Sequence, residues 1–532
     1  MRGSLIISFL ALALCSSLSA QESTATQAEV QRLRDSIAAQ EQQIESLRQQ
    51  LNQLENSLAA KAPEAQPKLP EAQQIAPAAK PENPAEPASI HYKGITFTPG
   101  GFFAAETAWR QRGLLSDVNT PFNSIPFGGS DQAHISDFFA SARQSRISLL
   151  VQGKLSSVKL TGFYELDWLS AGVTSNNNQS NSYTNRQRQI WGQAAFNNGW
   201  SFTGGQMWSL VTETKTGLDN RTETLPMTID AQYHVGFSWA RQFGLRVVKN
   251  LNNKAWVGLS IENPQTIFAA HGNANNFLLG GPGTGGGLYN LNSNYSFNSA
   301  PDVIVKAALE PGWGHYEVFG ILSQFHDRVY PNAVNATPSS LGAYNDNRTG
   351  GGFGANARGT VLHHVDLGIH LLAGDGVGRY GTSTLPDATV RPDGTLALLR
   401  AYQLLGTLEW HSKHWDWYTN YGTEYAQRAW FLNSAGKPVG YGSPLFSNAG
   451  CAFETVPGGS FTPASAANCT GDTRSITEAT VGFWYKFYNG SRGRVQWGPQ
   501  YSYVIRSAWS GTGGQPRTTE NMLFTSFRYY LP

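Results

Sequence analysis

A two-residue periodicity is the feature that most constrains the fold of this chain. In the stretch HWDWYTNYGTEYAQR, residues 414–428, Trp415 and Trp417 share one parity, whereas Asp416 and Glu424 share the other. Successive side chains of a strand point to opposite faces, so this segment would carry an aromatic face and a charged face. Such a strand must place its rings against an apolar surface and its charges in contact with water.

About sixteen segments of this kind follow one another from residue 94 onward. Turn-like sequences such as NNG and HSKH alternate along the chain with much longer connections. Short turns at one end of a meander and long loops at the other are typical of outer-membrane barrels. The predicted strands span 94–109, 140–153, 156–169, 186–197, 199–206, 235–249, 254–262, 302–310, 314–326, 351–360, 363–373, 396–411, 413–428, 475–488, 491–507 and 518–531.

We therefore predict an all-β fold, a transmembrane antiparallel β-barrel of about 16 strands that occupies residues 93–532. Closure of the sheet leaves no strand edge unpaired, and the aromatic face then contacts lipid while the charged face contacts water. The alternative is a soluble β-sandwich or propeller with its rings packed inward. That alternative does not explain the regular alternation of short and long connections.

The first 92 residues differ from the rest in composition. Residues 1–20 are predicted to be a secretory signal peptide, because Arg2 precedes a short apolar run that ends in small residues. Residues 61–92 are rich in Pro and Ala and are predicted to form a semi-rigid linker. An even number of strands with the short turns on the periplasmic side puts the start of the barrel on that side as well. The N-terminal segments are therefore predicted to lie in the periplasm.

Apolar residues recur every seven positions within residues 21–60, which predicts a short coiled coil. A single amphipathic helix that packs on the barrel is the alternative interpretation. The residues at the first seam position are Val30, Ile37, Ile44, Leu51 and Leu58.

The composition disfavours a soluble enzyme and a nucleic-acid binder. Only 14% of the residues are charged and 12% are aromatic, whereas about a quarter of a soluble protein is charged. The net charge of +2 is far from the strongly basic balance of nucleic-acid-binding proteins. Cys15 lies in the predicted signal peptide, so Cys451 and Cys469 remain and are predicted to form a disulfide in an exported chain.

Motifs of enzymes and cofactor sites are weak in this sequence. The segment GGPGTGGG, 280–287, lacks the Lys-Ser/Thr of a phosphate-binding loop, and no G-x-S-x-G motif is present. His364, Asp366 and His370 share one face of a predicted strand, a spacing that a metal site would use. No further cluster converges with them in the sequence, so we expect lumen lining, no metal, no cofactor and no catalytic site.

Three stretches resemble the DcaP-type porins, trimeric outer-membrane channels with a periplasmic N-terminal coiled coil. They are RQRQIWGQAAFNNGWSFTGGQMWSLV (186–211), LPMTIDAQYHVGFSWARQFGLR (225–246) and ARQSRISLLVQGKL (142–155). The resemblance implies a sixteen-stranded barrel, a homotrimer, and a preference for small anions such as dicarboxylates.

Parity assigns a set of basic residues to the lumen, and a pore selects by its diameter and by such charges. Arginine suits carboxylate solutes because its planar fork binds both oxygens. We expect a modest anion preference, because basic residues outnumber acidic residues on this face. The basic set is Arg146, Lys159, Arg246, Lys254, Lys306, Arg428, Lys486, Arg494 and Arg506, and the acidic set is Glu165, Asp167, Glu262, Asp416, Glu424 and Glu478.

Five arginines fall on the apolar parity of their strands. Because arginine at the bilayer midplane costs about 2 to 4 kcal/mol, each should lie at the membrane interface, at a protomer contact, or after a bulge that turns it inward. Sequence alone leaves these three placements open, and the resemblance favours inward positions for Arg186, Arg188 and Arg241. The remaining two are Arg143 and Arg400.

The connection 207–234 joins the fifth and sixth predicted strands, where porins carry a loop that folds into the barrel. By analogy, Lys215 and Arg221 would line a constriction with Glu213, Asp219 and Asp230. An ordinary surface loop is the alternative. The predicted function is passive diffusion of small anionic solutes across the outer membrane, and the rival is a plugged barrel that serves as an anchor or adhesin.

Overall fold

The structure is a computed structural model. It describes residues 89–114, 116–169, 184–272, 277–278, 297–333, 336–454, 456 and 467–532, together with the helical positions 31, 42, 45, 46 and 49. The chain divides into two compact units, Met1–Lys80 and Pro81–Pro532. The predicted signal peptide, coiled coil and linker lie outside the described residues, apart from those five positions and from residues 89–92, and stay predictions. Residues 90–92, predicted as the end of the linker, form a short strand instead.

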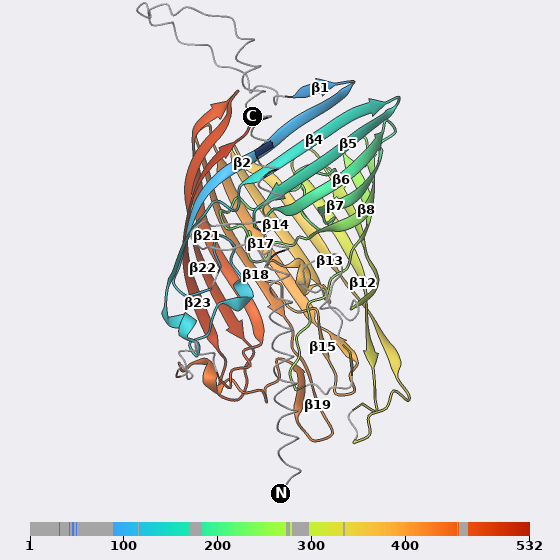
Figure 1. The fold of residues 1–532 in the computed structure, drawn as a ribbon, viewed down its shortest axis with the longest axis vertical. Helices are drawn as coiled ribbons and strands as arrows, with labels where there is room; N and C mark the ends of the chain where they lie inside the picture. The colour runs from blue at the N-terminus through green and yellow to red at the C-terminus, as the bar shows by residue number, and fades with distance from the viewer. Residues whose placement is uncertain are drawn as a thin grey trace, which may run out of the picture. The chain divides into compact units, whose positions relative to one another are not determined.

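Sixteen antiparallel strands of the described residues close into a barrel (Figure 1). Closure occurs where β2 (Ile95–Arg110) pairs with β23 (Arg517–Tyr530), in a register that runs from Phe102↔Tyr530 to Arg110↔Met522. The predicted antiparallel barrel is thereby confirmed. Between these two strands the barrel contains β4 (Arg146–Leu155), β5 (Val158–Asp167), β6 (Arg186–Phe196), β7 (Trp200–Trp208), β8 (Arg241–Leu251), β9 (Ala255–Glu262), β11 (Asn298–Leu309), β12 (His315–Val329), β13 (Tyr344–Leu362), β14 (Val365–Asp375), β17 (Arg400–His411), β18 (Trp415–Ala426), β21 (Thr473–Gly490) and β22 (Gly493–Ala508).

Shorter elements decorate the barrel. Three short strands extend the same sheet: β1 (Ile90–Tyr92), β3 (Asp137–Ser141) and β10 (Phe277–Leu278). Two hairpins lie in long connections and are formed by β15 (Ala388–Val390) with β16 (Leu396–Leu398), and by β19 (Ala429–Leu432) with β20 (Pro438–Tyr441). Four single-turn 3-10 helices are described: η1 (Phe122–Ser124), η2 (Asp131–His134), η3 (Gly378–Tyr380) and η4 (Ala449–Cys451).

The two ends of the barrel differ in their connections, as predicted. One end, called here the short-turn end, carries tight connections such as 156–157, 363–364 and 412–414. The other, the long-loop end, carries the long connections, including 209–240 and 427–472. The predicted disulfide joins Cys451 to Cys469 within the second of these loops. Among the described residues, no helix has both the length and the apolar character needed to cross a membrane.

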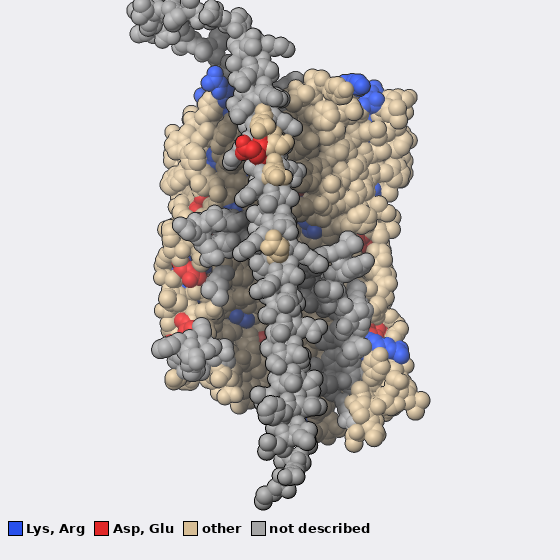
Figure 2. All heavy atoms as spheres, in the orientation of Figure 1, with Lys and Arg blue, Asp and Glu red and all other residues tan. Residues whose placement is uncertain are grey.

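The two faces of the strands separate as the alternation requires. On β18, Trp415 and Trp417 are exposed on the outside of the barrel, whereas Asp416 and Glu424 are buried on the inside. Exposed outward rings and aliphatic side chains recur on the other strands, so the outside is apolar. In the space-filling view, uncharged residues cover most of the visible outer surface, and Lys and Arg atoms appear at both the upper and the lower end (Figure 2).

A bulge in β6 explains how arginines of outward parity reach the inside. The register runs from Glu165↔Gln189 to Leu166↔Gln187, so Arg188 is one extra residue opposite β5. A one-residue shift reverses which face a side chain occupies. Arg188 and Gln189 are therefore both buried, while Gln187 remains exposed. Of the placements left open for Arg188, the bulge is the one observed.

Candidate permeation pathway

The connection between β7 and β8, residues 209–240 and called here the inserted loop, runs inside the barrel. Near its start it contacts the wall formed by β11 and β13. Lys306 Nζ donates a hydrogen bond to the Thr212 carbonyl oxygen at 2.8 Å, and Arg358 Nε donates to Glu213 Oε1 at 2.8 Å. Lys306 is fully buried, and its charge is paired there, since its Nζ also lies 2.7 Å from Glu317 Oε2.

Farther along, the inserted loop contacts a different part of the wall. The backbone N–H of Val235 donates to Glu478 Oε2 on β21 at 2.9 Å. The backbone N–H of Gly236 donates to Glu424 Oε1 on β18 at 2.8 Å. Gly236 has φ +88, and a Cβ there would lie 1.9 Å from the Leu404 carbonyl oxygen, so only glycine fits this approach. The loop therefore crosses the interior from the β11–β13 wall to the β18–β21 wall.

A second long connection, 111–136, packs against the inserted loop. The Thr120 N–H donates to Asp230 Oδ1 at 3.1 Å, and the Gln232 N–H donates to the same oxygen at 2.8 Å. Burial raises the pKa of Asp230 to about 6, although the nearby Arg110 partly offsets this. Arg506 Nη1 donates to the Ile125 carbonyl oxygen at 2.6 Å and so ties this connection to β22.

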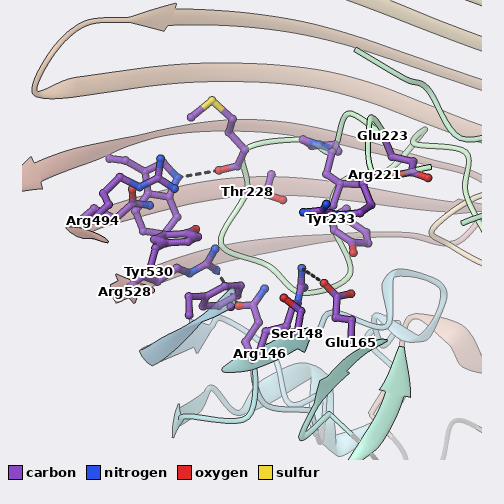
Figure 3. Close-up of a pocket in the computed structure, with 18 of the residues that line it drawn as sticks. Arg146, Ser148, Glu165, Arg221, Glu223, Thr228, Tyr233, Arg494, Arg528 and Tyr530 are labelled. Carbon is purple, nitrogen blue, oxygen red and sulfur yellow. Dashed lines mark hydrogen bonds and ion pairs between the residues drawn. The ribbon is translucent and has the colours of Figure 1, made fainter. Parts of the chain in front are cut away.

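A cavity of about 520 Å³ remains between the inserted loop and the wall (Figure 3). The wall strands β2, β4, β5, β22 and β23 contribute side chains, and the inserted loop contributes residues from 221 to 233. Side chains of opposite charge point into the same space in the close-up view. The labelled lining residues are Arg146, Ser148, Glu165, Arg221, Glu223, Thr228, Tyr233, Arg494, Arg528 and Tyr530.

A network of arginines and carboxylates covers the wall from β4 to β6. Arg186 binds Asp167 through both oxygens, with Nε at 2.9 Å from Oδ1 and Nη2 at 2.8 Å from Oδ2. Arg188 donates through Nε to Glu165 Oε1 at 2.7 Å and through Nη1 to Asp167 Oδ2 at 2.9 Å. Arg146 Nη1 lies 3.6 Å from Glu165 Oε2. Every arginine of this network thus has a carboxylate partner.

Arg221, Arg241 and Arg494 lie over aromatic rings, as Arg146 does over Phe102, but unlike Arg146 they have no ion pair with a carboxylate among the described residues. Arg494 lies 4.1 Å from the centroid of Tyr530, and Arg221 lies 5.0 Å from that of Phe163. Arg241 lies near two indole rings, those of Trp208 and Trp239, at 4.9 and 5.3 Å. Among the described residues, no carboxylate lies within ion-pair distance of these three arginines.

The other basic residues predicted from the sequence lie in several surroundings. Lys215 is exposed on the inserted loop, and Arg246 is buried and donates to the Trp208 carbonyl oxygen. Lys486 lies 2.9 Å from Asp416 on the neighbouring strand. Arg428 follows β18 in the long-loop region, where it lies over the ring of Trp509.

The two remaining arginines of outward parity lie at strand ends. Arg143, just before β4, is 2.9 Å from Asp117. Arg400 starts β17 at the long-loop end, where its exposed side chain pairs with Asp375 at 2.8 Å. A position at a strand end keeps a guanidinium out of the apolar middle of the outer face.

Two arginines that point into the barrel were missed by the sequence analysis. Arg528 on β23 lies 2.8 Å from Glu106 Oε1 and lines the cavity beside Tyr530. The alternation of Phe527 and Tyr529 on the outer face was a signal that could have placed Arg528 inside. Arg358 on β13 had no such signal, because the surrounding GGGFGANARG is too poor in large side chains to set a parity.

The histidines considered as metal ligands do not converge on one point. His370 is buried and contacts Asn356, whereas His364 lies in the turn before β14 with φ +72. Asp366 lies instead beside Glu409 and His411, a different group that could hold a metal ion. The pairing of β14 with β17 brings Asp366, Glu409 and His411 together, and the spacing of these residues in the sequence does not reveal that contact.

Comparisons with known proteins bear on the fold. No protein-family model matches the sequence, and no curated protein matches it. Among solved structures, the outer-membrane channel DcaP of Acinetobacter baumannii is similar with a TM-score of 0.57 and 14% identity, over 84% of this chain and 100% of that one. The barrel has the DcaP fold.

Two other solved barrels are less similar. OmpF of Salmonella typhi, in a complex with daunomycin, has a TM-score of 0.44 and 11% identity, over 84% of this chain and 100% of that one. An anion-selective porin from Comamonas acidovorans has a TM-score of 0.41 and 10% identity, over 82% of this chain and 100% of that one.

Proposed function

We propose that this chain is an outer-membrane porin through which small hydrophilic, anionic solutes diffuse passively. The observation that carries the proposal is the cavity of about 520 Å³ inside a closed barrel, lined by Arg221 and Arg494. Among the described residues, neither arginine lies within ion-pair distance of a carboxylate, although Glu223 and Glu165 act on Arg221 electrostatically. A guanidinium group that is not neutralised attracts anions and offers a fork to carboxylates. The similarity in fold to the DcaP channel is consistent with a transport role.

The apolar outer face supports a position in the outer membrane. Exposed rings such as Trp415, Trp417 and Trp497 suit the lipid interface, and closure satisfies the backbone hydrogen bonds of every barrel strand. By the usual topology of such barrels, the short-turn end faces the periplasm and the long-loop end faces outward. We also propose a homotrimer, with the coiled coil in the periplasm.

The constriction is proposed to be the inserted loop. Its hydrogen bonds to Lys306 and Arg358 on one wall and to Glu424 and Glu478 on the other support a fixed position across the lumen. Solutes would then pass through the space beside it, where the cavity lies. Arg146 and Arg188 would shape the wall, and Arg221 and Arg494 would attract the solute.

Purified protein in a planar lipid bilayer provides the test. We expect stepwise current and, under a KCl gradient, a reversal potential of the sign that anion preference gives. Addition of succinate to one side should reduce the chloride current, because both anions would compete for the same arginines. A cation-selective reversal potential would contradict the proposed selectivity.

A plugged barrel that acts as an anchor or adhesin is the second candidate. It is favoured by the apolar packing of the inserted loop, in which Leu210 and Val211 are buried against Ile304, Phe319 and Ile321. Absence of current from protein that migrates as a folded, heat-modifiable band would support this candidate. Current from the same preparation would exclude it.

A further inference from the structure

One histidine and two carboxylates converge on the inner wall near the short-turn end, on β14 and β17. Asp366 is the register partner of Glu409 on the neighbouring strand, and His411 follows Glu409 two residues later on the same face. His411 Nε2 lies 3.4 Å from Glu409 Oε2 and 3.7 Å from Asp366 Oδ2. One ligand atom from each residue lies within 4.8 Å of the others.

These separations suit a metal ion. Donor atoms that bind one tetrahedral zinc ion at about 2.1 Å lie roughly 3.4 Å from each other. The observed distances from His411 Nε2 are 3.4 and 3.7 Å, so only small side-chain movements would be needed. One imidazole nitrogen with two carboxylates is a donor set for a divalent transition metal such as Zn²⁺.

The opposite nitrogen of the imidazole is held in the way that metal-bound histidines require. His411 Nδ1 lies 3.1 Å from Asp416 Oδ1, and Lys486 Nζ lies 2.9 Å from the same oxygen. When Nδ1–H donates to Asp416, Nε2 keeps its lone pair and directs it towards Asp366 and Glu409. A carboxylate behind the histidine fixes its tautomer and increases its basicity as a ligand.

The two carboxylates are also held in place. Thr360 Oγ1 donates to Asp366 Oδ1 at 2.6 Å, which leaves Oδ2 directed at the histidine. Arg358 Nη1 lies 3.5 Å from Glu409 Oε2. The Glu409 side chain is only 8% exposed, and its Oε1 is buried with no hydrogen-bond partner among the described residues. Such an oxygen is costly to bury unless something binds it.

We propose that Asp366, Glu409 and His411 bind one divalent transition-metal ion on the lumen wall. His411 and Asp366 are partly exposed, so an ion can enter from the lumen and water can complete its coordination. Asp416, which orients the histidine, also lines the cavity described above. The proposal does not depend on conduction, because binding is measurable in protein that carries no current.

Zn²⁺ binding to detergent-purified full-length protein without an affinity tag tests this site. After treatment with EDTA and dialysis, isothermal titration should detect one site per chain that His411→Ala weakens at least tenfold. Asp416→Asn should weaken binding about 10- to 100-fold, the effect expected of a residue that orients a ligand. Co²⁺ should give the visible absorption of a bound, low-symmetry ion, and His411→Ala should remove it.

His363→Ala is the matched control, because His363 is exposed in the neighbouring turn and is not part of the cluster. It should bind Zn²⁺ as the unmodified protein does. Equal binding by the unmodified protein and His411→Ala would overturn the proposal, as would absence of any stoichiometric site. Heat-modifiable migration of each variant shows that the barrel is folded, and Glu409→Gln provides a second variant if His411→Ala does not fold.

Discussion

The wall from β4 to β6 and the arginines that lie on aromatic rings are two basic regions of the same lumen, yet they differ in their partners. On the wall, three arginines share the two carboxylates Asp167 and Glu165, and each of the three forms an ion pair. Arg494 lies against the ring of Tyr530 instead, and among the described residues no carboxylate pairs with it. We therefore infer that the first region stabilises the barrel and propose that the second acts on a passing anion.

An arginine that points into the barrel does not for that reason alone influence the selectivity of the pore. A buried pair contributes little field to the lumen, because the opposite charges cancel within a few ångströms. A guanidinium on an aromatic face keeps its full charge, since the ring supplies no countercharge. Whether an arginine stabilises the barrel or attracts an anion depends more on its distance from the nearest carboxylate than on its position inside the barrel.

Asp167→Asn should have the largest effect on stability. Asp167 is fully buried and binds two arginines, and removal of one partner from a buried ion pair costs about 3 to 5 kcal/mol. Urea unfolding in lipid vesicles should therefore shift to a lower midpoint. Asp375→Asn is the control, because Asp375 pairs with Arg400 in an exposed position. Equal midpoints for the two variants would show that the β4–β6 network does not stabilise the barrel.

Arg494→Ala should have the next effect, on selectivity instead of stability. Loss of one unit charge at about 4 Å removes about 1 kcal/mol of attraction in a water-filled lumen, roughly a fivefold change in local anion concentration. The anion-to-cation permeability ratio from reversal potentials should fall accordingly. Arg400→Ala, which removes an arginine from the rim, should leave the ratio unchanged. A drop of the same size in both variants would contradict a special role for Arg494.

Arg241→Ala should have the smallest effect of the three. Arg241 lies beside Trp208 and Trp239 and does not line the cavity, so its field reaches a solute from farther away. We expect a smaller fall in the permeability ratio than for Arg494→Ala, and Arg241→Lys should restore most of it. A larger effect than that of Arg494→Ala would place the solute path beside the indole rings.

Much of the fold followed from local patterns in particular strands. The alternation of Trp415 and Trp417 with Asp416 predicted the two faces of β18, and the turn HSKH predicted where that strand begins. Alternation failed at Arg188, because it predicts an outward side chain there and the bulge in β6 turns that side chain inward. Arg358 was missed because glycine and alanine around it leave no alternation to follow.

By itself, the sequence determined the barrel, its apolar outside, its two unequal ends and the cysteines that pair, because period-two alternation and turn residues act over a few neighbouring positions. Only the tertiary structure decided which charges meet. Lys306 joins Glu317, and His411 faces Asp366 and Glu409, through strand register and closure of the sheet. Those contacts depend on how neighbouring strands are paired, and no pattern within a single strand encodes that register.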